Sequence, residues 1–193
     1  MGKKVYPVVD FPHQLTIIFK GVFHYKYLYM SAYDWICENG WVSYTGDNKV
    51  ERLYAEEHLP GPIRKIWIWW RMQKDAGNSY YRYFMNVNWL GFGVSNVEIV
   101  KDGKKIKCQK GEINVIIKPW IELDWKDGWK NHPILKNFND LYQKRIIKED
   151  IYKRQNGLLE EAYRFHGMLK KTLELYHFVD DRELYGPEYA LNE

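Results

Sequence analysis

Histidine and cysteine are the side chains that most often bind metals or act as nucleophiles. This chain has six histidines and two cysteines. No two histidines stand three or four residues apart, and neither an HExxH nor a CxxC motif occurs. The histidines are His13, His24, His58, His132, His166 and His177. A metal site would have to be assembled from distant residues, so we expect no metal and no other cofactor.

The two cysteines differ in their sequence surroundings. Cys37 follows Ile36 in an amphipathic stretch, which indicates a buried and inert thiol. Cys108 lies among lysines, whose charge could lower its pKa, but no other residue nearby supports a catalytic role. Two cysteines in a chain of this length do not form a disulfide-rich scaffold, so we expect both thiols to be reduced.

Three further sequence patterns, namely carboxylate pairs, a GxSxG motif and a glycine-rich phosphate loop, give no evidence of catalysis or phosphate binding. Carboxylate pairs occur at Asp34 and Glu38, Glu56 and Glu57, and Glu122 and Asp124, and each is typical of a solvated surface. No GxSxG motif is present. Gly91-Phe92-Gly93 precedes a strand pattern and not a helix, which favours a β-bulge or a bend over a phosphate loop. We therefore expect a protein that is not an enzyme.

Aromatic and basic residues alternate between positions 63 and 72. Lys65, Trp67, Trp69 and Arg71 share one strand face, where rings can stack on bases while cations hold phosphates. The alternative is that Trp67 and Trp69 lie beneath a long helix, since both faces of this strand are apolar at the centre. The low net charge of +4 and the lack of an RNP-like motif favour this alternative. We predict no specific nucleic-acid partner and name Trp67 and Trp69 as candidate protein-interface residues.

Opposite charges gather at two other places in the sequence. Residues 100–111 carry Lys101, Lys104, Lys105, Lys107 and Lys110 against Asp102, and residues 177–193 carry five acids against Arg182. Such charges can steer the tail of one copy to the hairpin of another. The alternative is a lysine-rich hairpin that protects a sheet edge and a tail without a binding site. The candidate interface residues here are Lys101, Lys104, Lys105, Lys107, Tyr185, Tyr189 and Leu191.

These residues need a scaffold, and the composition provides for one. The chain has 193 residues, of which 46% are hydrophobic and 17% aromatic, enough for a substantial core. We predict an extended N-terminal arm at 1–13, a single domain at 14–176 and an acidic tail at 177–193. The longest apolar run, 66–70, is far too short for a membrane span, and no secretory signal is evident. An intracellular, soluble protein is expected, or one within a particle assembled from intracellular subunits.

The elements follow from periodicity and turn residues. Strands are predicted at 15–23, 41–44, 63–72, 80–90, 94–100, 104–108, 112–118 and 121–125, and helices at 27–39, 132–147 and 151–176. Asp102-Gly103 provides the turn of a hairpin. Gly157 marks a kink or a close helix contact. In the strand 80–90, Tyr81, Tyr83, Met85, Val87 and Trp89 point to the core, whereas Arg82, Phe84, Asn86 and Asn88 face water, a partner or a wet pocket.

The predicted fold class is α+β: a curved antiparallel sheet of about six or seven strands with an early short helix and long C-terminal helices. Over residues 15–176 this order resembles the helix-grip order of START-like and related ligand-binding domains, a likeness of element order alone. The predicted core comprises Leu15, Ile17, Phe19, Trp35, Ile66, Ile68, Tyr83, Met85, Val87, Ile113, Val115, Phe165 and Leu169.

Two functions remain open. The first is a non-enzymatic structural or protein–protein interaction subunit of a larger assembly, including one built from copies of itself, held by aromatic surfaces and terminal arms. The alternative, which the helix-grip resemblance implies, is binding of an apolar small molecule or lipid between the sheet and the C-terminal helix. The candidate pocket residues for that function are Arg82, Phe84, Asn86, Asn88 and Phe165.

Overall fold

The computed structural model of the chain describes residues 8–10, 14–77, 80–101 and 104–174. Its elements in chain order are β1 (Val8–Asp10), β2 (Leu15–Phe23), α1 (Tyr25–Glu38), β3 (Val42–Ser43), β4 (Glu51–His58), β5 (Arg64–Asp75), β6 (Tyr81–Lys101), β7 (Lys104–Leu123), α2 (Leu135–Leu141), the π-helix η1 (Tyr142–Ile146) and α3 (Lys148–Glu174).

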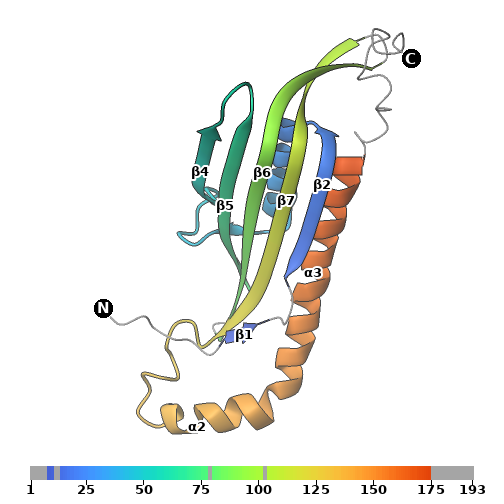
Figure 1. The fold of residues 1–193 in the computed structure, drawn as a ribbon. Helices are drawn as coiled ribbons and strands as arrows, with labels where there is room; N and C mark the ends of the chain where they lie inside the picture. Colours follow the sequence, from blue (N-terminus) through green and yellow to red (C-terminus); the bar gives the residue numbers. More distant parts are fainter. Residues whose placement is uncertain (1–7, 11–13, 78–79, 102–103, 175–193) are drawn as a thin grey trace, which may run out of the picture.

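All strand pairings in the described chain are antiparallel, and the sheet is open, in the order β1–β7–β6–β5–β3. β2 also pairs with β7 and β4 also pairs with β5, so each edge of the sheet consists of two short segments. Figure 1 shows the sheet curving, with the β6–β7 hairpin reaching past the ends of β2 and β5. The predicted fold class, α+β with a curved antiparallel sheet, is confirmed.

The core lies between one face of this sheet and the helices α1 and α3, which Figure 1 shows behind the strands. Alternate residues of β5, β6 and β7 point into it, and the largest are Trp70 and Trp89. Nine of the predicted core residues are buried: Ile17, Ile66, Ile68, Met85, Val87, Ile113, Val115, Phe165 and Leu169. The other four, Leu15, Phe19, Trp35 and Tyr83, are partly buried and pack against them. The alternation of side chains along each strand explains this agreement.

Local sequence signals fix the ends of α1. The His24 side chain accepts a hydrogen bond from the backbone N–H of Tyr27 at 3.0 Å, which satisfies one of the free donors of the first turn. The helix ends before Gly40, whose φ of +75° suits a residue without a side chain. Leu28, Ala32 and Ile36, four residues apart, face the sheet. This spacing was the basis for predicting the helix.

The strands β6 and β7 are longer than predicted because their glycines and proline do not interrupt pairing. Gly91-Phe92-Gly93 lies within β6, where the register with β7 shifts between Phe92 and Ser95, so the prediction of a bulge is confirmed and the prediction of separate strands is wrong. Pro119 is tolerated in β7 because it lies between the pairing with β2, which ends at Ile117, and the pairing with β1, which begins at Trp120.

The edge strand β4 was not predicted. Half of its sequence, ERLYAEEH, is charged, and it lacks a clear alternation of apolar and polar residues. Charged side chains are common on edge strands, where they discourage pairing with other chains. Pairing with the apolar strand β5, and not intrinsic propensity, therefore forms this strand.

The C-terminal helices differ from prediction in their bounds. The expected helix at 132–147 is two short elements, α2 and the π-helical turn η1, and the long helix begins at Lys148. Gly157 is exposed and a Cβ there would have nothing within 4 Å, so it is no close contact point with another helix. Buried Leu158, Phe165 and Leu169 face the sheet instead.

Within the predicted N-terminal arm, Val8–Asp10 forms a strand with β7, and residues 1–7 and 11–13 lie outside the described residues. The candidate interface residues Tyr185, Tyr189 and Leu191 also lie outside them. Lys101 and Lys104 end β6 and begin β7, paired with each other in register.

Candidate functional site

The sheet face opposite α1 and α3 carries no helix among the described residues, and it faces the viewer in Figure 1. We call it the helix-free face. It consists of the alternate residues of the strands that do not enter the core, and its central members are Tyr44, Trp67, Trp69, Arg71, Phe84, Asn86, Asn88, Leu90, Ile116, Lys118 and Trp120. The prediction that Trp67 and Trp69 lie beneath the long helix is therefore wrong, because α3 covers the other face.

An apolar platform occupies one half of the helix-free face. In the sheet register Trp67 stands beside Leu90, and Trp69 stands beside Asn88, which in turn neighbours Ile116. Trp69 is 41% exposed, a large fraction for an indole on a central strand. Exposed aromatic groups of this size are enriched where proteins bind one another.

Arg71 lies at the border of this platform and is held in place. Its Nη1 donates to Asn88 Oδ1 and to the carbonyl oxygen of Trp70, both at 2.8 Å, and its guanidinium lies 5.3 Å from the ring centre of Trp69. Burial lowers the pKa of this guanidinium from its ordinary value, which is so high that the group stays charged at neutral pH. No ion pair joins Arg71 to a carboxylate of the described residues. A fixed cation without an internal counter-charge can receive an acceptor from a partner.

A stacked aromatic group fills the other half of the face. Phe84 and Trp120 are parallel at 5.3 Å, and Tyr44 meets Phe84 edge-on at 5.5 Å. The Tyr44 hydroxyl donates to Asn86 Oδ1 at 2.8 Å, and burial raises its pKa to about 12. These contacts hold the rings and the amide in one arrangement, so a partner would meet an ordered surface.

The contacts of Arg82 are with other residues of the fold, which leaves its guanidinium less available to a ligand. Its Nη1 contacts Asp75 Oδ2 at 3.0 Å, its Nε donates to Gln73 Oε1 at 3.3 Å, and the guanidinium lies 4.4 Å from the ring centre of Trp125. With these partners Arg82 fastens the end of the β5–β6 pair to the residues after β7.

The predicted pocket between the sheet and the C-terminal helix does not bring its residues together. Four of them lie on the helix-free face: Arg82, Phe84, Asn86 and Asn88. This agrees with the expectation that they point away from the core. Phe165 lies on the other side of the sheet, is fully buried, and packs on Trp35 with the ring centres 4.9 Å apart. Because the sheet lies between Phe165 and the other four residues, these five residues cannot line one cavity.

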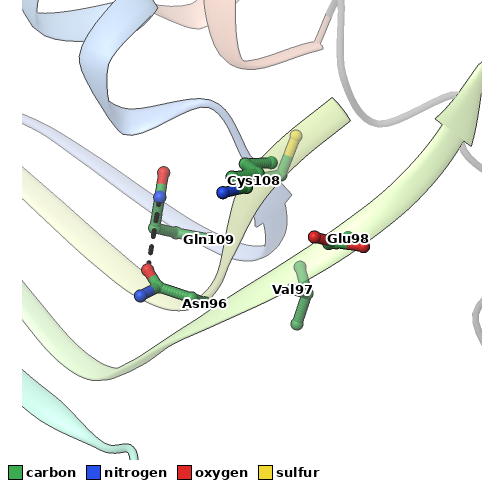
Figure 2. Close-up of a pocket in the computed structure, with 6 residues that line it drawn as sticks. Asn96, Val97, Glu98, Cys108 and Gln109 are labelled. Carbon is green, nitrogen blue, oxygen red and sulfur yellow. Dashed lines mark hydrogen bonds between the residues drawn. The ribbon is translucent and has the colours of Figure 1, made fainter. Parts of the chain in front are cut away.

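The ribbon formed by residues 96–101 and 104–109 carries the chain's lysine-rich turn and a hollow. The hollow has a volume of about 500 Å³ and is lined by Asn96, Val97, Glu98, Lys107, Cys108 and Gln109. Figure 2 shows Gln109 donating to Asn96 within it, at 3.4 Å. Cys108 is buried, and burial raises the pKa of its thiol. The positive charge nearby does not activate this thiol, which is correspondingly a poor nucleophile.

Two lysines of this ribbon, Lys105 and Lys107, have described side chains. Lys105 and Lys107 are exposed, and Lys107 stands beside Glu98 in register. The charged side chains of this two-stranded extension thus meet solvent, whereas Ile99 and Cys108 are buried against Val22. Neither lysine lies near the helix-free face, because the ribbon extends beyond β5.

Two aromatic residues of the helix-free face were absent from the sequence-based candidates. Tyr44 reaches the face from the turn after β3, which no periodicity could indicate. Trp120 alternates with Lys118 and Glu122, a usable signal, but the predicted interruption at Pro119 concealed that these residues continue one strand face.

In the part of the chain that the structure describes, no three His, Cys, Asp or Glu side chains are grouped so that they could hold a metal ion. None of the described helices is both long and apolar enough to cross a membrane. No protein-family model, no curated protein and no solved structure matches this chain.

Proposed function

We propose that the chain is a non-enzymatic subunit of a protein assembly and that its helix-free face binds a second copy of the chain. The observation that carries the proposal is the apolar platform of Trp67, Trp69, Leu90 and Ile116 on the sheet face that α1 and α3 do not cover. Trp69 is exposed there and the other three side chains are half-buried. A two-layer domain normally buries each apolar face against another element. Here the described chain provides that cover on one side alone.

The composition of the face supports protein binding in particular. Trp, Tyr and Arg are the residues that contribute most to binding when they are desolvated at the centre of an interface. Trp69, Tyr44 and Arg71 provide one of each, and hydrogen bonds to Asn86 and Asn88 hold two of them in place. Fixed side chains lose little conformational freedom on binding.

The proposal is tested by the mass of the protein in solution across concentration, measured by light scattering. Trp69→Lys places a charge on the platform, and we expect it to lower the mass at any given concentration. Tyr163→Lys is the matched control, because Tyr163 is also an exposed aromatic residue but lies on α3. A wild-type mass of one chain at all concentrations, or equal masses for both variants, would contradict the proposal.

A second candidate function is binding of a small molecule in the hollow of the ribbon, since its volume of about 500 Å³ is within the range of ligand sites. Four of its six lining residues are polar or charged, which favours a polar ligand over a lipid. A thermal-shift screen of polar and apolar compounds would test it. If a compound raises the melting temperature of the wild type and not that of the Asn96→Leu variant, the binding is assigned to the hollow.

A further inference from the structure

The segment of residues 130–148, which contains α2 and η1, presents an apolar surface that no described element covers. Its side chains Ile134, Phe138, Leu141 and Ile146 are between 45% and 67% exposed. Phe138 and Leu141 stand three residues apart on one face of α2, and Ile134 directly precedes this helix. α2 packs substantially on η1 alone, and Figure 1 shows it at the end of the sheet, turned away from α3.

The base of this segment is firmly attached, so its apolar surface has a defined position. Trp129 stacks on Tyr142 with the ring centres 4.2 Å apart, and Gln143 Nε2 donates to the Tyr80 hydroxyl at 3.0 Å. The buried carboxylate of Asp124 accepts the backbone N–H groups of Trp129 and Lys130. These contacts join the segment to the residue before β6 and to the residue after β7.

The charge of the segment indicates what kind of partner fits it. Between residues 130 and 148 the sequence has five basic residues, Lys130, Lys136, Lys144, Arg145 and Lys148, and a single acid, Asp140. A partner that combines apolar side chains with negative charge would be complementary to this net charge of +4.

The chain itself contains such a partner, in residues 175–193. This stretch of 19 residues has five acids, Asp180, Asp181, Glu183, Glu188 and Glu193, against Arg182, together with Phe178, Leu184, Tyr185, Tyr189 and Leu191. It follows directly on Glu174, the last residue of α3, whereas the basic segment ends at Lys148, the first residue of α3. The 27 residues of α3 separate the two by about 40 Å at 1.5 Å per residue.

We infer that residues 175–193 of one copy bind the apolar face of α2 and η1 of a second copy, so that chains associate head to tail. The inference rests on the proposed function and names a second contact for it, distinct from the helix-free face. Complementary charges at opposite ends of one rod-like helix favour a contact between copies that repeats from one copy to the next. Such a contact is heterologous, and it generates rings or filaments.

The experiment uses the full chain carrying Trp69→Lys, in which the contact at the helix-free face is removed. We expect this protein still to associate and the association to weaken as salt is added. Adding Phe138→Glu, or reversing the acids with Asp180→Lys, Asp181→Lys and Glu183→Lys, should reduce the mass to that of one chain, 23.4 kDa. An equimolar mixture of these two variants should give a species of two chains and nothing larger, because it contains one intact contact per pair. Tyr163→Glu is the control that should leave the association unchanged.

Three results would overturn the inference. The Trp69→Lys protein could be a single chain although the wild type is larger, in which case the proposed function stands and this contact does not exist. The mixture could stay at one chain. Vesicles containing one-quarter anionic phosphatidylglycerol could bind the Trp69→Lys protein through Phe138 while the protein does not self-associate, which would make the segment a lipid-binding surface. A wild type that is always a single chain would contradict the proposed function as well.

Discussion

Glu161 is a carboxylate of α3 that the fold buries against the sheet. Its Oε1 accepts from Trp41 Nε1 at 2.9 Å and from Lys74 Nζ at 2.7 Å, so the residue connects α3 to β5 and to the residue before β3. A buried charge costs free energy unless it is paired and hydrogen-bonded, and here it is both. Sequence reasoning did not find this site, because the partners are 87 and 120 residues away.

The two partners of this ion pair should not be equally sensitive to substitution. Lys74→Met leaves a carboxylate whose side chain is only 9% exposed without its cation, and we expect a loss of about 3 kcal/mol in the free energy of unfolding. Glu161→Gln keeps an acceptor for Trp41 and leaves a lysine that reaches water, so it should cost about 1 kcal/mol. Urea unfolding of both variants and of the double variant tests this. Additive costs would show that the two side chains are not coupled.

Glu122 should give the stability of the protein a specific pH dependence. Burial raises the pKa of this carboxyl from its usual 4.5, although a hydrogen bond from Trp120 Nε1 at 3.2 Å opposes the shift. A raised pKa means that the folded state binds the proton more tightly than the unfolded state does. The stabilisation is thus present below 4.5 and is lost as the pH rises through the folded pKa.

Glu122→Gln removes this titration and keeps an acceptor for Trp120. We expect the variant to be more stable than wild type at neutral pH and equally stable at acidic pH below 4.5. Urea unfolding at a series of pH values measures the difference. A difference of the same size at both ends of the series would mean that the carboxyl does not titrate with a raised pKa.

The individual candidate residues of the helix-free face were the hardest part to predict. Arg71 and Trp69 were recognised as neighbours on one strand face, but whether a helix covers that face depends on where α3 packs. The pairing of Arg82 with Phe165 in one pocket failed for the same reason, since alternation along a strand separates two faces without showing which one is buried.

At the scale of elements, two kinds of glycine have opposite roles. A Cβ on Gly111 of β7 would lie 3.0 Å from the Phe92 carbonyl oxygen and 3.0 Å from Val94 Cα, which are backbone atoms at the bulge of β6. Gly157 and Gly167 on α3 have open space around the same position. The bulge requires the first glycine, whereas the helix merely tolerates the others.

We therefore expect Gly111→Ala to lower the free energy of unfolding by about 2 kcal/mol, because backbone atoms cannot easily move aside. Gly157→Ala and Gly167→Ala should each raise it by up to about 1 kcal/mol, through better helix propensity. Urea unfolding midpoints measure all three. An alanine at Gly111 without cost would indicate that the bulge adjusts to a side chain.

Element types could be predicted wherever local periodicity agreed with tertiary packing. The strand 15–23 and the helix 27–39 followed from spacing and turn residues, and the structure has the strand at Leu15–Phe23 and the helix at Tyr25–Glu38. β4 and the uninterrupted course of β6 and β7 could not be predicted, because pairing with neighbours decides them. Residues such as Gly91 and Pro119 indicate a turn when the sequence is considered alone. Within a sheet the same residues are accommodated by a bulge or by a gap between two strand pairings.

At the scale of the whole molecule, three surfaces are candidates for binding: the helix-free face, the α2–η1 segment and the ribbon. The ribbon is the alternative site for the acidic tail, since it is also rich in lysine. The segment differs from it by offering four exposed apolar side chains together with its charge. Residues 175–193 contain both acidic and apolar side chains, so a surface that is both basic and apolar is complementary to them, and a surface that is only basic is less so.

The variant Lys105→Glu/Lys107→Glu separates these sites. Both lysines are exposed on the ribbon, so reversing their charge should leave the fold intact. We expect the salt-sensitive association of the Trp69→Lys protein to persist in this variant with its mass unchanged. Light scattering at low and high salt measures it, and a fall to one chain would place the tail on the ribbon.

The position of α3 has a mechanical consequence for any head-to-tail array. The basic segment precedes this helix and the acidic stretch follows it, so tension between neighbouring copies would be transmitted along the helix axis and not through the strands. Pulling would shear Leu158, Phe165 and Leu169 past the sheet all at once. Beyond that point the helix could uncoil from about 40 Å to about 90 Å. Each subunit would then lengthen under load, and the core face of its sheet would lose the side chains of α3 that cover it.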